Sequence, residues 1–287
     1  MPATRNPILI TGCSSGIGAA AADLLIKGGY TVYATARRPE TLEALAGHGA
    51  RVLALDVTSE ESMSAAVAAV EAEHGRVGTL VNNAGYGEYG TIEETDLDAV
   101  RRMFETNVFG LARLTQLVLP GMRAVGTGLV VNIGSMGGRI TFPVGGYYHA
   151  TKHAVEAITD ALRHEVRDLG IAVTLIEPGP IRTNFEETIN ASAAVGGPRA
   201  ADRADTAASG PYAALVAAAR AANADAYASR ALAAGPEAVA RAVLRAVEAE
   251  RPRPRYLVTA TARALVHTRR LGGDRVWDAL VDRQYTR

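Results

Sequence analysis

The sequence predicts an α/β fold of the doubly wound Rossmann type, with a parallel sheet of about seven strands and helices on both faces. Short apolar runs rich in β-branched residues alternate along the chain with longer, Ala-rich segments of helical periodicity. The runs lack the polar alternation of a half-exposed strand, which indicates strands that are buried on both faces. A glycine-rich turn joins the first run to the first helical segment.

Seven apolar runs have the length and composition of strands. They are residues 7–11, 31–35, 51–55, 79–83, 128–134, 172–178 and 255–259. Helical periodicity separates them, near residues 16–28, 60–74, 96–124 and 148–169, and a further helix is expected to begin near Pro236. Because 287 residues are enough for one large domain, we expect residues 1–287 to form a single Rossmann-type domain.

Two segments fall outside this alternation. Residues 186–235 are Ala-rich, carry Gly and Pro at 196–198 and 210–211, and show no strand pattern. We expect this segment to be helical and partly mobile, either as a surface insertion of low complexity or as a lid over a substrate. The lid is favoured because loops at the carboxyl ends of parallel strands form the ligand crevice. Residues 258–287 are expected to form a C-terminal helical extension that packs on the domain or on a partner.

The composition excludes several classes of protein. Lys and Arg together number 30, as do Asp and Glu, so no net basic charge favours nucleic acid or an anionic membrane. The single cysteine, Cys13, suits a reducing compartment. The N-terminal segment lacks a signal-peptide pattern, and no run of about 20 apolar residues predicts a membrane span. We therefore expect a soluble, cytoplasmic protein.

The first expected strand ends in the turn "TGCSSGIG", residues 11–18. Glycines allow the backbone to approach a pyrophosphate, and the N-terminus of the following helix offers N–H donors and a positive dipole end. A glycine-rich turn alone can be no more than a tight turn. Its place between the first strand and the first helix favours a dinucleotide site. The residues expected to form it are Gly12, Ser14, Ser15, Gly16, Ile17 and Gly18.

The second and third strands predict which dinucleotide binds. Ala36 stands where a carboxylate would hold the ribose 2′-OH of NAD, and Arg37 and Arg38 follow it. A guanidinium can bind a 2′-phosphate, so NADP(H) is favoured over the alternative that both arginines are solvated loop charges. After the third strand, Asp56 can accept a hydrogen bond from adenine, with Val57 supplying backbone groups. Asp56 could equally cap the next helix.

The stretch "YYHATK" at 147–152 supplies a candidate acid/base. Tyr148 and Lys152 lie four residues apart and so share a helix face, whereas Tyr147 points about 100° away and would form a wall of the pocket. A nearby ammonium lowers a tyrosine pKa, which suits a general acid/base for a carbonyl–alcohol pair. Ser135, at the end of the fifth strand, can donate a hydrogen bond to a substrate carbonyl oxygen. Each feature alone is common.

Taken together, the motifs resemble the short-chain dehydrogenase/reductase family over nearly the whole chain up to about residue 260. The matching stretches are "TGCSSGIG", "DV" at 56–57, "NNAG" at 82–85, Asn107 in "FETNVFG", Ser135, "YHATK" and "PGPIRT" at 178–183. Within the family, "VYATAR", "YYHATKHAVEA" and the long C-terminal region are most similar to hydroxysteroid and retinol dehydrogenases.

The resemblance implies a role for each matching residue. Tyr148 would be the acid/base, Ser135 would orient the carbonyl, and Lys152 would tune Tyr148 and hold the nicotinamide ribose. Asn107 would bind a water that links Lys152 to solvent; without the resemblance, it would be interpreted as a helix-interior asparagine bonded to backbone. Further cofactor contacts are implied for Asn83, Ala84, Gly85, Pro178, Gly179, Ile181 and Thr183, although plain turns would also explain the glycines and prolines among them.

The expected activity is NADP(H)-dependent interconversion of a ketone or aldehyde with an alcohol, on an apolar small-molecule substrate. The alternative is a catalytically silent NADP-binding regulatory or scaffold protein of the same fold. A sugar-nucleotide epimerase is disfavoured by the G-x-x-x-G-x-G spacing, and a serine hydrolase by the lack of G-x-S-x-G around Ser135. No metal site is expected, because His149 and His153 lack a third ligand at suitable spacing. The resemblance implies a homodimer or homotetramer through the helices at 96–124 and 148–169.

Overall fold

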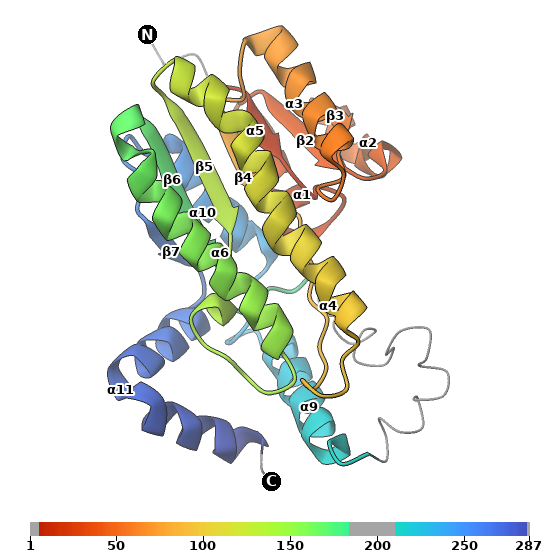
Figure 1. Ribbon diagram of the computed structural model, residues 1–287, viewed down its shortest axis with the longest axis vertical. Helices are drawn as coiled ribbons and strands as arrows, with labels where there is room; N and C mark the ends of the chain where they lie inside the picture. Colours follow the sequence, from red (N-terminus) through yellow and green to blue (C-terminus); the bar gives the residue numbers. More distant parts are fainter. Residues whose placement is uncertain (1–5, 184–209, 286–287) are drawn as a thin grey trace.

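A computed structural model describes residues 6–183 and 210–285 of the chain. Its centre is a seven-stranded parallel sheet in the order β3-β2-β1-β4-β5-β6-β7 (Figure 1). The strands are β1 (Ile8–Ile10), β2 (Val32–Ala36), β3 (Arg51–Ala54), β4 (Thr79–Asn82), β5 (Gly128–Ile133), β6 (Ile171–Glu177) and β7 (Arg255–Leu257). All seven expected strands and the doubly wound fold class are confirmed.

The helices also follow the predicted periodicity. Those described are α1 (Gly16–Lys27), α2 (Glu43–Gly47), α3 (Glu60–His74), α4 (Leu97–Phe104), α5 (Leu111–Ala124), α6 (Gly146–Glu165), α9 (Ala213–Ala228), α10 (Pro236–Glu248) and α11 (Ala260–Tyr285). The single helix expected at 96–124 is α4 and α5 joined by a π-helical turn at Glu105–Gly110. None of the described helices has the length and apolar character that a membrane crossing would require.

The two faces of the sheet carry separate hydrophobic cores, because successive side chains of a strand point to opposite faces. In β1, Ile8 and Ile10 pack toward α1 and α10, whereas Leu9 faces the side covered by α3 and α5. Figure 1 shows α5 and α6 in front of the sheet, with α1 and α10 behind it. Burial on both faces explains why the strands show no polar alternation in the sequence.

The segments outside the alternation are helical where the structure describes them. Helix α9 lies within the expected lid at 186–235; the part of that segment up to residue 209 lies outside the described residues. Helix α11 forms the C-terminal extension and is bent at Gly273, whose φ of 67° is not helical. A small hydrophobic cluster joins Val216 and Ala219 of α9 to Tyr285 at the end of α11 and to Val144. Helices α9 and α11 therefore pack against each other beside the sheet.

A partly buried charge cluster joins β7 to α6 and β6. Arg255 Nη2 lies 2.9 Å from Glu156 Oε2 and also pairs with Asp160, both on α6. At the end of β6, Glu177 is fully buried, with Arg139 Nη1 3.5 Å and Arg255 Nε 3.9 Å from its Oε1. Burial and the neighbouring Glu156 carboxylate raise the pKa of Glu177 above its ordinary value. Two carboxyl groups that share one buried site favour a protonated Glu177.

Glu177→Gln should therefore change how stability depends on pH. In the wild type, the folded state holds the Glu177 proton more tightly than the unfolded state, whose carboxyl titrates near 4.5. Its contribution is thus fully present below that pH and declines as the pH rises above it, by on the order of 1–3 kcal/mol. Urea unfolding from pH 5 to pH 8 should show a flatter profile for E177Q, with the exposed Glu250→Gln as control. A wild-type slope retained in E177Q would contradict the assignment.

Candidate functional site

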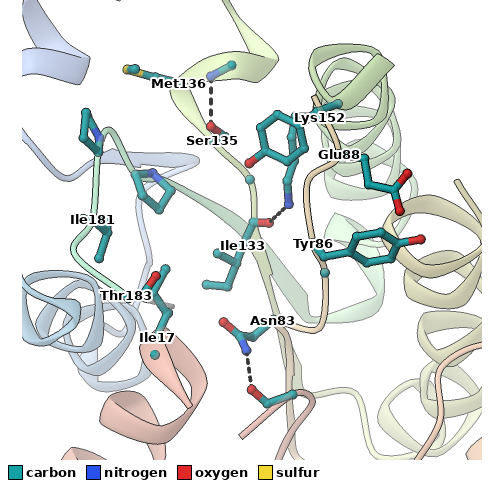
Figure 2. Close-up of a pocket in the computed structure, with 18 of the residues that line it drawn as sticks. Ile17, Asn83, Tyr86, Glu88, Ile133, Ser135, Met136, Lys152, Ile181 and Thr183 are labelled. Carbon is teal, nitrogen blue, oxygen red and sulfur yellow. Dashed lines mark hydrogen bonds between the residues drawn. The ribbon is translucent and has the colours of Figure 1, made fainter. Parts of the chain in front are cut away.

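A cavity of about 1080 Å³ opens at the carboxyl ends of the strands, where parallel α/β sheets bind ligands. Its walls come from the loops that follow β1 to β6 and from α9 and α11. Figure 2 shows lining residues from the loops after β1, β4, β5 and β6 around this space. Most of the residues predicted for the site line it: Gly12, Ser14, Ser15, Gly16, Ile17, Arg37, Asp56, Val57, Asn83, Ala84, Gly85, Ser135, Tyr148, Lys152, Pro178, Gly179, Ile181 and Thr183. Gly18, Arg38 and Asn107 lie outside the lining.

The glycine turn after β1 is shaped by close backbone packing. Gly12 has a φ of 71°, and a Cβ on it would lie 2.9 Å from Ala84 Cα. A Cβ on Gly18 would lie 2.3 Å from Gly12 O and 2.5 Å from Asn83 Nδ2. Gly18 thus lets α1 pack against the turn and does not face the cavity, which is why it is absent from the lining.

The start of α1 is suited to an anion. Within the described chain, no side chain caps this helix at Ser15, and its first turn carries no acidic residue. The leading N–H groups and the positive end of the helix dipole therefore face the cavity beside Gly16 and Ile17. This cradle, which side chains larger than glycine would fill, fits the pyrophosphate of a dinucleotide.

The ends of β2 and β3 place one arginine and one carboxylate at the cavity. Arg37 lines it, whereas the Arg38 carbonyl accepts a hydrogen bond from Thr41 Oγ1 at 2.7 Å at the start of a 3₁₀ turn. Asp56 Oδ1 accepts from the N–H of Thr58 at 2.9 Å. The cap of α3 is Ser59, not Asp56, so the capping alternative for Asp56 does not hold.

Tyr148, Lys152 and Ser135 meet at the cavity wall. Tyr148 and Lys152 come from the first turns of α6, and the Tyr148 hydroxyl hydrogen-bonds to Ser135 just after β5. Lys152 Nζ donates to Ile133 O at 3.0 Å, as drawn in Figure 2, and lies 5.9 Å from the centroid of the Tyr148 ring. Tyr147 lies outside the lining and donates to Ile92 O at 3.2 Å, so the expectation that it forms a pocket wall is wrong. Of the two adjacent tyrosines, Tyr148 is therefore the one that shares a helix face with Lys152 and borders the cavity.

Burial dominates the electrostatics of this group. It lowers the pKa of the Lys152 ammonium to about 8, and it raises the pKa of Tyr148 to about 12, although the Ser135 hydroxyl opposes the rise. The lowering of the Tyr148 pKa that we expected from Lys152 is therefore not found. The reason is that both groups are buried, and desolvation of the phenolate outweighs its attraction to an ammonium.

Asn107 lies behind the cavity wall and uses its whole amide in hydrogen bonds. Its Oδ1 accepts from Tyr86 N–H at 3.0 Å, and its Nδ2 donates to Tyr86 O at 2.8 Å and to Thr151 Oγ1 at 3.1 Å. The asparagine thus ties the loop after β4 to α6. These contacts agree with the interpretation of a helical asparagine bonded to backbone; its part in a water chain stays a prediction.

Several lining residues were not named individually from the sequence. Among them are Tyr86, Glu88 and Tyr89 after β4, Met136, Phe142 and His149 around the loop after β5, Ala222, Asn223, Ala226, Tyr227 and Leu232 within the expected lid, and Thr261, Leu265, Gln284 and Tyr285 from α11. The first group could have been found, because it directly follows "NNAG" at a strand end. Nothing in the sequence indicates that residues 284–285 return to the cavity.

The described residues contain no group of three or more His, Cys, Asp or Glu side chains that could hold a metal ion. His149 is buried and borders the cavity, whereas the side chain of His153 is exposed and its Nδ1 lies 2.9 Å from His149 O.

Comparison with known proteins gives matches over most of the chain. A family model described as short chain dehydrogenase matches residues 6–194. An uncharacterized oxidoreductase, YbbO, of Escherichia coli is 36% identical over 278 residues, which are 96% of this chain and 94% of that protein. Human retinol dehydrogenase 8 is 40% identical over 196 residues, 65% of this chain and 62% of that protein.

Solved structures agree with these matches. A short-chain dehydrogenase from Streptomyces avermitilis has a TM-score of 0.81 and 35% identity, with 98% of each chain covered. A serine dehydrogenase complexed with NADP+ has a TM-score of 0.71 and 27% identity, covering 88% of this chain and 93% of that one. A short-chain dehydrogenase/reductase from Burkholderia phymatum in complex with NAD has a TM-score of 0.77 and 26% identity, covering 94% and 95%.

Gly18→Ala should destabilise the protein, because its methyl group would meet Gly12 O and Asn83 Nδ2 at contact distances that backbone cannot easily relieve. We expect a loss of about 1–3 kcal/mol in the free energy of unfolding, measured with urea. Gly47→Ala is the matched control, since a Cβ there meets nothing within 4 Å. A G18A variant as stable as G47A would show that the close packing of α1 on the turn is relaxed without loss.

Proposed function

This chain belongs to the short-chain dehydrogenase family, and we propose that it is an NADP(H)-dependent oxidoreductase that interconverts a ketone or aldehyde with an alcohol. The observation that carries the proposal is the convergence of three groups on one cavity. Tyr148, hydrogen-bonded to Ser135, borders the same cavity as the glycine turn, and Lys152 lies on the same helix face. This arrangement joins a proton donor to a dinucleotide cradle.

The residues divide the reaction between binding and proton transfer. The glycine turn and the N-terminus of α1 would hold the pyrophosphate, and a bound nicotinamide supplies or accepts the hydride. With a pKa of about 12, Tyr148 is protonated at neutral pH and can give its proton to the oxygen of a carbonyl substrate. The Ser135 hydroxyl, beside Tyr148, can donate to the same oxygen and stabilise its developing charge.

Preference for NADP(H) rests on the end of β2. Ala36 and Arg37 both line the cavity there, so a small side chain stands where NAD-binding folds place a carboxylate. The Arg37 guanidinium can pair with a 2′-phosphate. Among the similar solved structures, one is a complex with NADP+ and another is a complex with NAD.

An apolar substrate is supported by the aromatic and aliphatic side chains of the cavity wall. Phe142, Leu265 and Tyr227 line the cavity, together with Met136, Tyr89, Ala222, Ala226 and Tyr285. Their surfaces favour a neutral, largely hydrocarbon substrate through burial of apolar area. The similarity to retinol dehydrogenase 8 agrees with this class.

We also propose that the protein is cytoplasmic and forms a homodimer or homotetramer. The single cysteine, Cys13, is buried as a free thiol, which suits a reducing compartment. Leu97 on α4 and Phe109 just before α5 are 53% and 55% exposed, on the helices expected to form the interface. Covering these side chains would stabilise an assembly.

The proposal is tested with a panel of apolar ketones, aldehydes and alcohols, assayed with NADPH and with NADH at the nicotinamide absorbance. We expect turnover of at least one carbonyl with NADPH. Tight binding of NADPH without turnover of any carbonyl would favour a silent cofactor-binding protein. Absence of binding to either dinucleotide would overturn the proposal altogether.

Tyr148→Phe should lower kcat by about 10²–10⁴-fold, because it removes the proton donor and leaves the ring in place. The dissociation constant for NADPH, measured by fluorescence titration, should stay within about threefold, since the phenol is not part of the glycine turn. Tyr147→Phe is the control; it loses the hydrogen bond to Ile92 O, outside the cavity. An inactive Y147F beside an active Y148F would reverse the assignment.

Arg37→Asp should weaken NADPH binding by roughly 10- to 100-fold, the loss expected for one charge-assisted hydrogen-bonded pair. NADH binding should change much less or improve, because a carboxylate at this end of β2 suits a ribose 2′-OH. Arg38→Asp provides the comparison, since Arg38 does not line the cavity. Unchanged preference for NADPH in R37D would remove Arg37 from the cofactor site.

A further inference from the structure

His149 follows Tyr148 in the first turn of α6 and has no part in the chemistry described so far. Its side chain is only 3% exposed and borders the cavity. The ring Nδ1 accepts a hydrogen bond from the Phe142 N–H at 3.3 Å. Tyr89 and Phe142 both contact the ring edge to face, with centroids 6.2 and 6.1 Å away. The imidazole therefore joins α6 to the loop between β5 and α6.

Two glycines hold the ring between them. A Cβ on Gly137 would lie 2.7 Å from Cδ2 of His149, and a Cβ on Gly145 would lie 2.7 Å from its Cε1. Gly137 and Gly145 lie near the two ends of the loop, so the ring fits between its first and last residues. No larger side chain could occupy either position without moving the imidazole.

The loop that His149 holds is strained. Val144 has a φ of 68°, a left-handed conformation that a β-branched residue rarely adopts. Such a residue persists only where the surrounding contacts fix it. The imidazole of His149 lies against the chain on both sides of Val144, because it accepts from the Phe142 N–H and its Cε1 packs beside Gly145.

The same loop begins at the catalytic serine. Ser135 Oγ accepts from the N–H of Gly137 at 3.0 Å, and Ser135 hydrogen-bonds to Tyr148. A Cβ on Gly137 would lie 3.3 Å from both Ser135 Oγ and His149 Nε2. The contacts thus form a closed circuit from Tyr148 through Ser135 and Gly137 to His149, which is bonded to Tyr148 along the chain.

We propose that His149 is a positioning residue that, as a neutral imidazole protonated on Nε2, fixes the loop 136–145 and thereby the distance between Ser135 and Tyr148. Acceptance of the Phe142 N–H by Nδ1 requires this tautomer. Burial acts in the same direction and, together with the neighbouring His153 on α6, lowers the pKa of His149 to about 4. The consequence for catalysis rests on the proposed function. The tautomer of His149 and its role in fixing the loop 136–145 do not.

The tautomer can be measured in the unmodified protein. Nitrogen-15 chemical shifts of the histidine rings should show His149 neutral, with its proton on Nε2, from pH 6 to pH 8. A proton on Nδ1, or a charged ring in this range, would overturn the proposal without any variant. This result does not depend on whether a substrate is known.

Two substitutions distinguish the hydrogen-bond acceptor role of His149 Nδ1 from the packing of its ring. His149→Asn keeps an oxygen near the position of Nδ1, whereas His149→Leu fills the space without an acceptor; His149→Met is the second apolar variant if H149L does not fold. We expect the Phe142 amide to lose its protection from hydrogen exchange in H149L and to keep it in H149N. The exposed His164→Leu, near the C-terminal end of the same helix, should leave this protection unchanged.

Turnover then tests the effect on the site. H149L should lower kcat about tenfold or more, because displacement of Ser135 misplaces the donor, while NADPH affinity stays within about twofold. H149N should stay within about threefold of the wild type. Equal losses in both variants, or normal turnover in H149L, would overturn the positioning role. If the wild-type protein turns over no carbonyl, the proposed function is refuted instead. The hydrogen-exchange and tautomer results would still show whether His149 fixes the loop 136–145.

Discussion

The site depends on a set of hydrogen bonds between the ends of β1 and β4, the two central strands from which the chain winds in opposite directions. Thr11 Oγ1 accepts from the N–H groups of Asn83 and Ala84 at 3.0 and 2.9 Å. Asn83 Nδ2 in turn donates to Thr11 O at 2.9 Å and to Gly12 O at 3.0 Å. These bonds fix the glycine turn against the loop after β4. Residue 12 must be glycine, because its φ is positive and a Cβ on it would meet Ala84 of that loop. The loops on both sides of the cavity follow strands that lie on either side of this contact.

A second set of hydrogen bonds connects the loop after β4 to α6, which carries Tyr148. The loop after β4 continues to Tyr86, whose backbone is bound by Asn107, and Asn107 also donates to Thr151 Oγ1 on α6. Tyr148 lies one turn before Thr151, whose hydroxyl also donates to Tyr148 O at 2.8 Å. Hydrogen bonds between buried groups therefore fix the position of Tyr148 relative to the glycine turn. Such a network is rigid because each buried polar group would lose its partner if one element moved.

Local pattern made the sheet and much of the site predictable. Buried strands, the glycine turn and the shared face of Tyr148 and Lys152 all follow from spacing in the sequence. What spacing cannot give is the competition between burial and charge, so the pKa of Tyr148 was predicted in the wrong direction. Nor can it show that Gly18 serves helix packing instead of the ligand. Contacts between residues far apart in sequence, such as Tyr285 at the cavity, have no local signal at all.

Helix α11 reaches the loop after β5 from the far end of the chain. Trp277 Nε1 donates to Thr141 O at 3.2 Å, and the indole packs with Ile140 and Phe142. Residues that shape the cavity near Tyr148 thus lie well beyond residue 194, where the match to the family model ends. The matched residues 6–194 contain the glycine turn and the Tyr148–Lys152 pair, whereas α9 and α11, which supply much of the remaining cavity wall, lie after them. A change in α9 or α11 could therefore alter the shape of the substrate chamber without touching the residues that hold the cofactor or move the proton.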